Sequence, residues 1–169
     1  MTGKRTPRPN RGPGNTNPKT WDIEISDAEA IARENFGLDC RVERLPGEVD
    51  RNFLLNTDTG DRWVLKISRP KADRQVLECQ LEALRFLESS AVEKLVQRVL
   101  ATRDGRSLIP VEIAEEGRCW ARILSYIDGT PLARHPDRPV RLHQQIGRNL
   151  ARLDLALRGF DHPGTHREM

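Results

Sequence analysis

The feature that most constrains this chain is a series of three short β-favouring segments, the last of which carries a lysine near its end. The segment CRVERL (40–45) alternates apolar and polar residues, while NFLLNT (52–57) and RWVLKI (62–67) are rich in apolar residues. The last two flank DTGD (58–61), whose Asp and Gly residues favour a tight hairpin turn. The sequence therefore predicts three antiparallel strands, with Lys66 near the end of the third.

Helical patterns lie on both sides of these strands. In SDAEAIARENFG (26–37), Ser26 and Glu29 have the spacing of a capping box, and Gly37 is placed to end the helix. After the third strand, DRQVLECQLEALRFLESS (73–90) has apolar residues close to helical spacing, which predicts one long amphipathic helix. The apolar positions of this longer helix are Val76, Leu77, Leu81, Leu84, Phe86 and Leu87.

The second half of the chain continues with strands and one more helix. LVQRVLAT (95–102) and SLIPVEIA (107–114) bracket RDGR and predict another hairpin, and RCWARILSYI (118–127) predicts a strand that ends at DGTP. A final helix is predicted over 141–160. Its apolar stripe consists of Leu142, Ile146, Leu150, Leu153 and Leu157. This order of elements predicts an α+β fold in which an antiparallel sheet of about five strands packs on one long helix.

The charge of the chain is concentrated at its N-terminus. Residues 1–20 contain five Lys and Arg residues, no acidic residue, four prolines and three glycines, so this segment is predicted to be a disordered basic tail. The remaining residues carry 23 Lys and Arg against 25 Asp and Glu. A folded part with this balance does not predict a specific nucleic-acid interface. The tail is either a solvated extension or a segment that contacts phosphate backbones or acidic partners without specificity.

The cysteines and the hydropathy pattern indicate a cytoplasmic protein. Cys40, Cys79 and Cys119 are odd in number and far apart, and each has apolar neighbours, which suits buried thiols in a reducing compartment. The basic N-terminus is not followed by the apolar stretch of a secretory signal, and no apolar run reaches the length of a membrane span. We therefore expect no membrane contact.

Three longer segments carry a family resemblance. LPGEVDRNFLLNTDTGDRWVLKI (45–67), ARILSYIDGTPL (121–132) and IGRNLARLDLALRGFDHPGTHRE (146–168) resemble the aminoglycoside phosphotransferase and choline kinase superfamily, which has a protein-kinase-like fold. They most resemble its hydroxylysine kinase branch. The resemblance implies a nucleotide-binding N-lobe and a hinge linker followed by the first helix of a truncated C-lobe. The expected boundaries are 1–20 for the tail, 21–127 for the N-lobe and 128–169 for the linker and the incomplete C-lobe.

The resemblance also implies an activity. Kinases of this superfamily transfer the γ-phosphoryl group of a nucleotide, here ATP or GTP with Mg²⁺, to a small molecule, which for this branch is a hydroxyl of a small amino acid or amino alcohol. The residues do not distinguish adenine from guanine, nor do they identify the acceptor.

Lys66 and the loop before the second strand are the first expected binding residues. The resemblance implies that Lys66 pairs with the nucleotide phosphates, whereas without it Lys66 reads as an ordinary lysine at a strand edge. The loop 46–52 would cover the phosphates with its backbone N–H groups, with Gly47 allowing a close approach and Asp50 and Asn52 orienting the loop. The alternative is a plain polar connection between strands.

Two further groups of residues are implied by the resemblance. The superfamily places a glutamate on the long helix to hold the lysine, and the corresponding position here is Gln80. Glu78 and Glu82 lie two positions to either side, about 200° around the helix, so neither replaces it without a change in register. Glu78 or Gln80 is nevertheless expected at the site, and Glu82 is expected to be a surface charge. The purine edge is expected at the hinge backbone, which comprises Ser125, Tyr126 and Ile127.

No catalytic or metal-binding residue is predicted in this chain. The superfamily uses a His-x-Asp loop followed by an Asn, and then a second Mg²⁺ aspartate. The one His-x-Asp here, His135 to Asp137, lies in the linker with no Asn at the matching distance. We therefore expect the chain to be inactive alone. A different class of function, a non-catalytic kinase-like interaction module or a decayed remnant, stays open, with the apolar stripe of the last helix covered by a missing C-lobe or by a partner chain.

Overall fold

The computed structural model of the chain describes residues 22–114, 116–135, 137 and 139–166, so the predicted tail lies outside the described residues. In chain order the elements are α1 (Ile25–Phe36), β1 (Cys40–Leu45), β2 (Arg51–Thr57), β3 (Arg62–Ile67), α2 (Arg74–Glu88), η1 (Glu93–Leu95), β4 (Val99–Leu100), β5 (Ile109–Ile113), β6 (Gly117–Ser125), η2 (Leu132–Arg134), α3 (Val140–Ala156) and η3 (Pro163–Thr165). In this part of the chain, no helix combines the length and the apolar character needed to cross a membrane.

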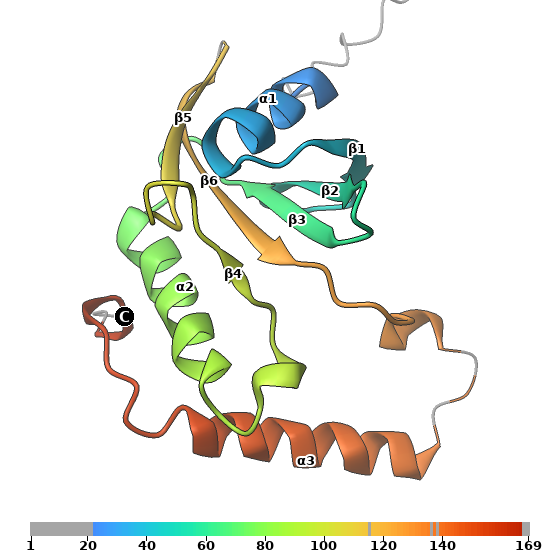
Figure 1. Cartoon of the computed structure of the whole chain (residues 1–169). Coiled ribbons are helices and arrows are strands. Elements are labelled where there is room, and N and C mark those ends of the chain that lie inside the picture. The colour runs from blue at the N-terminus through green and yellow to red at the C-terminus, as the bar shows by residue number, and fades with distance from the viewer. Residues whose placement is uncertain (1–21, 115, 136, 138, 167–169) are drawn as a thin grey trace, which may run out of the picture.

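The six strands form one antiparallel sheet (Figure 1). Its order is β1-β2-β3-β6-β4, and β5 also pairs with β6, so the sheet has six strands where about five were predicted. The Asp/Gly turn at 58–61 joins β2 to β3 as predicted. The strand β3 lies between β2 and β6 in the interior of the sheet, and this position decides how its lysine is presented.

The predicted hairpin between 95–102 and 107–114 is wrong. The turn between these segments exists, with the Thr102 amide donating to the Arg106 carbonyl at 2.7 Å. However, β4 and β5 each pair with β6 and not with each other. β6 is nine residues long, so β5 pairs with its first half and β4 with its second half along the same edge. A turn pattern in the sequence is local and does not show that a third strand is available to both segments.

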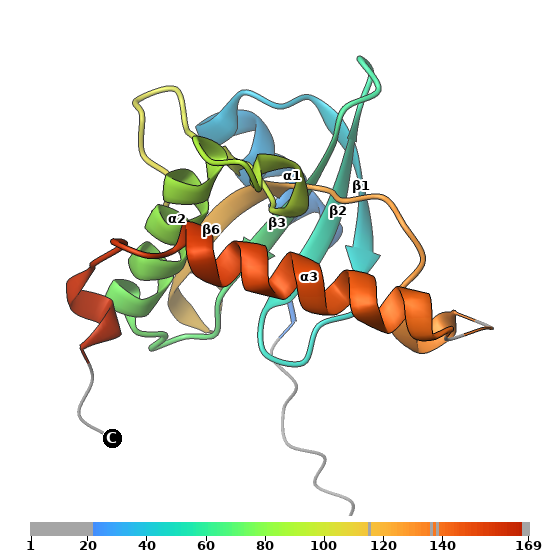
Figure 2. The same cartoon turned by 90° about the horizontal axis from the view of Figure 1, so that it is seen from below.

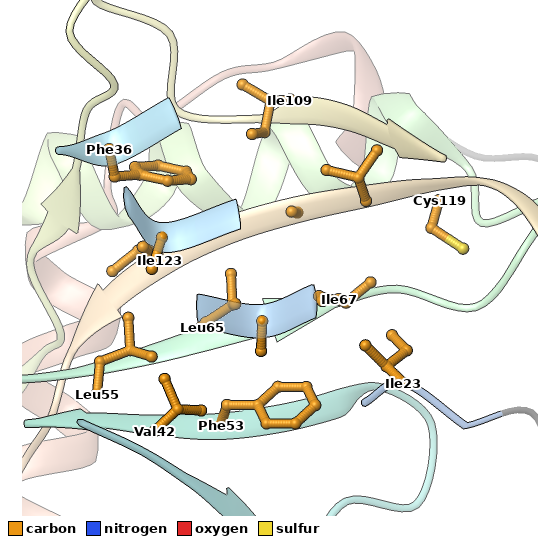
Figure 3. Packing of buried hydrophobic residues seen from close by; sticks show 14 of the residues in the cluster. Ile23, Phe36, Val42, Phe53, Leu55, Leu65, Ile67, Ile109, Cys119 and Ile123 are labelled. Atoms are coloured by element: carbon orange, nitrogen blue, oxygen red, sulfur yellow. The ribbon is translucent and has the colours of Figure 1, made fainter. Parts of the chain in front are cut away.

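The main core lies between the sheet and α1 (Figure 3). Side chains on alternate positions of a strand share one face, and this face of β2, β3 and β6 supplies Phe53, Leu55, Leu65, Ile67 and Ile123, all completely buried. The helix supplies Ala28, Ala32 and Phe36. The strand β5 extends the same core with Ile109, Val111 and Ile113. The opposite face of the sheet is left to form the candidate site.

The first helix begins earlier than the sequence predicts. Glu24 is the N-cap residue, with extended backbone angles, and its carbonyl accepts from the Ala28 amide at 3.2 Å. Ser26 therefore lies inside the helix and the predicted capping box does not form. Ile23, which is completely buried, fixes where the chain enters the core and so sets the start of the helix. The predicted end at Gly37 is confirmed, because Gly37 adopts the left-handed conformation with φ of 70°.

The longer helix α2 lies on the other side of the sheet from α1 (Figure 1). Asp73 caps it by accepting from the Gln75 amide at 2.9 Å, and Leu77, Leu81 and Leu87 are its buried residues. The turn η3 packs on the outer side of α2, where the rings of Phe86 and Phe160 lie 5.5 Å apart.

The last helix, α3, crosses the side of the molecule shown in Figure 2. None of its residues is buried, although the predicted stripe residues Leu142, Ile146 and Leu153 are half-buried. Arg152 joins the helix to the segment between α2 and η1 by donating to the Ala91 carbonyl at 2.8 Å.

Candidate functional site

Lys66 lies on the sheet face opposite the main core. In the register of the sheet it is paired with Asn52 in β2 and with Arg122 in β6. Its amine donates to Asn52 Oδ1 at 2.9 Å and lies 3.6 Å from Asp50 Oδ2. The side chain is only 26% exposed. Because β3 is an interior strand, Lys66 is not an edge lysine that extends freely into solvent.

The surroundings of Lys66 act on its pKa in opposite directions. Burial is the largest cause and lowers the pKa of Lys66 from its ordinary value of 10.5. The carboxylate of Asp50 raises the pKa, and the guanidinium of Arg122 lowers it. The net result is a lowered pKa, which means that the amine is partly desolvated and is held by a carboxylate and an amide.

The loop between β1 and β2 folds back on itself close to this lysine. Asn52 Nδ2 donates to the Pro46 carbonyl at 3.1 Å, so one side chain connects the start of the loop to Lys66. A Cβ atom added at Gly47 would lie 2.3 Å from the Asp50 carbonyl oxygen and 2.4 Å from Asn52 Nδ2. Glycine is therefore required here by close approach within the loop.

Two pockets meet at Lys66. One, of about 680 Å³, lies between the loop and the segment leading into α2, with Val49, Asp50, Arg69 and Lys71 among its lining residues. The other, of about 400 Å³, is more apolar and lies between the sheet and α2. Its apolar lining comprises Leu81, Ala83, Leu84, Leu87 and Leu124. Lys66, Gln80 and Arg122 line both pockets. A charged end beside an apolar end suits a ligand that has both a phosphate group and a flat ring.

The α2 residues considered in the sequence analysis, Glu78, Gln80 and Glu82, lie in different places in the structure. Gln80 is exposed and lines both of the Lys66 pockets. Glu78 instead pairs with Arg74, at 2.7 Å, and lines a different pocket together with Glu82. Glu82 is exposed, as expected for a surface charge, and lies 3.6 Å from His162. The structure therefore brings Gln80 to the lysine and does not bring Glu78 there.

The hinge begins directly after Leu124, which lines the apolar pocket, and its residues Ser125 and Tyr126 line a further pocket of about 680 Å³. Some of the hinge backbone groups are already used. The Ser125 amide donates to the Arg98 carbonyl at 2.8 Å, and the Tyr126 amide donates to the Arg62 carbonyl at 3.0 Å. The Ser125 carbonyl accepts from Gln97 Nε2 and keeps a second lone pair. In the described residues, the backbone of Ile127 makes no hydrogen bond to another backbone group. A purine edge at the hinge would therefore meet the Ser125 carbonyl and Ile127, and not the amides of Ser125 and Tyr126.

Arg122 is a site residue that the sequence analysis missed. It lies directly beside Lys66 in the sheet, is only 4% exposed, and its Nη2 lies 2.7 Å from Asp50 Oδ2. Its second nitrogen, Nη1, is buried and has no hydrogen-bond partner in the described structure. A signal was present, because an arginine interrupts the apolar run WARIL (120–124) of the strand predicted over 118–127.

The residues around Lys66 fit an anionic group. Lys66 and Arg122 share the single carboxylate of Asp50, which leaves one formal positive charge. For a metal ion the described residues offer less, because they contain no cluster of three or more His, Cys, Asp or Glu side chains. His135 contacts the Asp137 carbonyl within the linker and lines none of the pockets described above.

Comparisons with known proteins agree with this geometry. Residues 41–168 match the model of a family described as "Phosphotransferase enzyme family". Hydroxylysine kinase of Bos taurus is 31% identical over 90% of this chain, and that of Danio rerio is 29% identical over 85%. The chain spans 43% and 41% of the lengths of these two relatives.

Two solved structures share the fold. A microcompartment-associated aminopropanol kinase has a TM-score of 0.65 at 19% identity and covers 86% of this chain, which in turn covers 44% of it. An amicoumacin kinase in complex with AMP-PNP, Ca²⁺ and Ami has a TM-score of 0.63 at 14% identity. It also covers 86% of this chain, which covers 44% of it. These matches confirm the predicted α+β, kinase-like fold. From the family match over residues 41–168, the chain belongs to the phosphotransferase enzyme family, with relatives among the hydroxylysine kinases.

Proposed function

We propose that this chain is the nucleotide-binding part of a small-molecule kinase. In this proposal Lys66 binds the phosphates of ATP or GTP carried with Mg²⁺, and the whole enzyme transfers the γ-phosphoryl group to a hydroxyl of a small amino acid or amino alcohol. The observation that carries the proposal is the partly desolvated amine of Lys66, which is held by Asn52 and Asp50 where two pockets meet. It lies beside the loop between β1 and β2 that contains Gly47, the glycine loop.

The physical basis is charge and position. The phosphate end of the nucleotide would lie at the polar pocket, where Lys66, Arg69 and Lys71 supply positive charge. The base would lie in the apolar pocket beside Leu124, with its edge towards the Ser125 carbonyl of the hinge. The metal ion would neutralise charge on the phosphates, and the residues described here would bind and orient the nucleotide. A hydroxylysine kinase relative and a neighbour that holds AMP-PNP support this assignment.

The test is a calorimetric titration of the full chain with Mg-ATP and with Mg-GTP. We expect saturable binding of at least one nucleotide, together with thermal stabilisation of about 1.4 kcal/mol at ten times Kd. The Lys66→Ala variant should bind at least about tenfold more weakly, since a lost charge-assisted contact costs on this order. Arg85→Ala removes an exposed positive charge that lines a different pocket and should bind like the unchanged chain. A folded chain that binds neither nucleotide would contradict the proposal.

A second candidate function, a non-catalytic interaction module, is favoured by the surface of α3. Val140, Leu150 and Leu155 are each more than half exposed, so α3 presents apolar side chains that a partner could cover. This module would use α3 as a contact surface and would not depend on Lys66. Nucleotide binding that is lost in Lys66→Ala would separate the two functions in favour of the kinase.

A further inference from the structure

Arg122 is a charged residue in the buried part of a sheet. Its position on β6 pairs with Lys66 on β3, and Leu124 and Val64 on the same face are also buried. A guanidinium keeps its charge under all conditions in a protein, so a buried one needs a carboxylate close by. Two cations side by side on neighbouring strands also repel each other. The arrangement therefore requires a specific negative partner.

Asp50 is that partner for both cations. One carboxylate oxygen, Oδ2, lies 2.7 Å from Arg122 Nη2 and 3.6 Å from Lys66 Nζ. Asp50 is the last residue before β2, so its carboxylate comes from the end of the glycine loop and not from a helix. Its side chain is 15% exposed, which makes these attractions stronger than they would be in water.

The long helix α2 supplies no such carboxylate to the lysine. Gln80, a neutral residue, is the α2 side chain that lines both Lys66 pockets, whereas Glu78 is paired with Arg74. Asp73 lines one of the pockets but caps α2 by accepting from the Gln75 amide. Among the described residues, the ion pair of Lys66 is made with Asp50.

Stability alone does not account for the Asp50–Arg122 pair. Burying a charged pair costs desolvation energy that the attraction often only balances. Here Arg122 Nη1 is buried without a hydrogen-bond partner, so part of that cost is not recovered. What the pair does provide is a fixed place for the Asp50 carboxylate beside Lys66.

We propose that Asp50, held in place by Arg122, is the carboxylate that positions Lys66 for the nucleotide phosphates, so that the glycine loop and not the helix α2 sets the position of the lysine. This inference rests on the proposed nucleotide-binding function. It makes Asp50 and Arg122 positioning residues that act through Lys66. It also couples the loop to the lysine, because a loop that opens carries Asp50 away from the amine.

The decisive variant is Asp50→Asn/Arg122→Met. It removes one negative and one positive charge, so the net charge around Lys66 is unchanged and neither Asp50 nor Arg122 is left without the other. We expect a folded chain whose affinity for Mg-ATP in calorimetry is at least about tenfold lower, since the lysine has lost its positioning partner. A folded double variant that binds Mg-ATP within about twofold of the unchanged chain would overturn the inference.

A matched control and a second variant accompany this measurement. Asp104→Asn/Arg106→Met makes the same exchange of charges at an exposed pair, 2.7 Å apart, and should bind Mg-ATP normally. Asp50→Glu keeps both charges and the partner of Arg122 but moves the carboxylate by one methylene group. It should also bind at least about tenfold more weakly, and it decides the question if the double variant does not fold. Normal binding by Asp50→Glu would overturn the inference.

A measurement without nucleotide separates this inference from the proposed function. The pKa of Lys66 can be followed by NMR on ¹³C-dimethylated lysines in the unchanged chain and in Asp50→Asn. The groups nearest the amine are Asp50 from the loop, Arg122 from β6 and the neutral Asn52 from β2. The larger pocket is also lined by the neutral Gln80 from α2 and by Arg69, Lys71 and Asp73. Losing Asp50 removes the carboxylate and leaves Arg122 unbalanced, so the pKa of Lys66 should fall. If the unchanged chain binds no nucleotide, the proposed function fails, and an unchanged Lys66 pKa in folded Asp50→Asn would contradict the inference independently.

Discussion

Asn52 connects the lysine to the loop, because its amide group bonds both to the Lys66 amine and to the Pro46 carbonyl. The shape of the loop is therefore determined by side-chain contacts as well as by the backbone at Gly47. Gly47 lies where the loop folds most tightly against Asp50 and Asn52. At the scale of single residues, this means that a small change in the loop should affect the lysine directly.

Gly47→Ala tests this tight fold. The added Cβ would lie 2.3 Å from the Asp50 carbonyl oxygen, so the loop must move and we expect Mg-ATP affinity to fall at least about tenfold. Calorimetry of the folded variant is the measurement. Gly147→Ala is the control, since no atom lies within 4 Å of the added Cβ in α3 and alanine favours a helix. Unchanged affinity in Gly47→Ala would show that the loop does not hold this conformation when nucleotide binds.

The lowered pKa of Lys66 predicts a pH dependence with opposite signs for stability and for binding. Between the lowered pKa and 10.5 the unfolded chain binds more protons than the folded chain, so the contribution of Lys66 to stability rises with pH in that window. Nucleotide affinity should instead fall as the pH rises through the lowered pKa, because the charged amine is lost. A titration of Mg-ATP affinity against pH should show an inflection below 10.5.

Lys66→Arg is the reference for this pH profile, because a guanidinium stays charged throughout the range. It should show no inflection, whatever its absolute affinity. An unchanged chain that gives the same flat profile as Lys66→Arg would mean that the titration of Lys66 does not control binding.

At the scale of elements, the sequence predicted the bounds of those strands that depend only on nearby residues. β1 and β3 occupy the predicted residues, because each pattern and its flanking turns are contained in one short segment. The start of α1 was wrong because the burial of Ile23 outweighs the capping pattern at Ser26. The turn between β4 and β5 did not show that each of them pairs with β6, because that pairing depends on a strand that follows later in the chain.

The candidate site was predicted to a similar extent. The positions of Lys66 and Asn52 follow from the strand order and the loop, and they lie together in the structure. The sequence did not show which α2 residue faces the lysine, because that depends on how the helix is rotated against the sheet. The rotation is set by Leu77 and Leu81, which are buried and leave Gln80 on the lysine side. Arg122 was missed because the sequence does not show that its strand pairs with β3 and so places Arg122 beside Lys66.

The contact between η3 and α2 gives a prediction for these two elements. A Cβ added at Gly164 would lie 2.8 Å from Cys79 Cβ and 2.9 Å from the Gln75 carbonyl oxygen, so Gly164→Val should displace η3 from the helix. Cys79 would then become more accessible, and its rate of alkylation by iodoacetamide should rise several-fold. Mass spectrometry of the native chain measures this rate, with completely buried Cys119 as an internal reference. An unaltered rate at Cys79 in folded Gly164→Val would contradict the contact.

At the scale of the whole molecule, one sheet separates two environments. The face towards α1 is a closed apolar core, and the face towards α2 carries Lys66, Asp50 and Arg122 beside two pockets. The chain spans about 43% of its bovine relative, so catalysis and the choice of acceptor are properties proposed for the whole enzyme. The central claim to be tested is the proposal that the part described here binds the nucleotide.

The most direct test is covalent labelling with an acyl-phosphate derivative of ATP, which transfers its acyl group to an amine that lies beside the nucleotide phosphates. The chain has five lysines, at positions 4, 19, 66, 71 and 94, so mass spectrometry can compare all of them in one sample. The account predicts that Lys66 is labelled and that excess Mg-ATP protects it. Lys71 lines the same pocket and is expected to share this label and its protection to a smaller extent, while the lysines at positions 4, 19 and 94 label weakly and without protection. Label spread over the lysines, with no protection of Lys66 by Mg-ATP, would contradict the assignment of this lysine to the nucleotide phosphates.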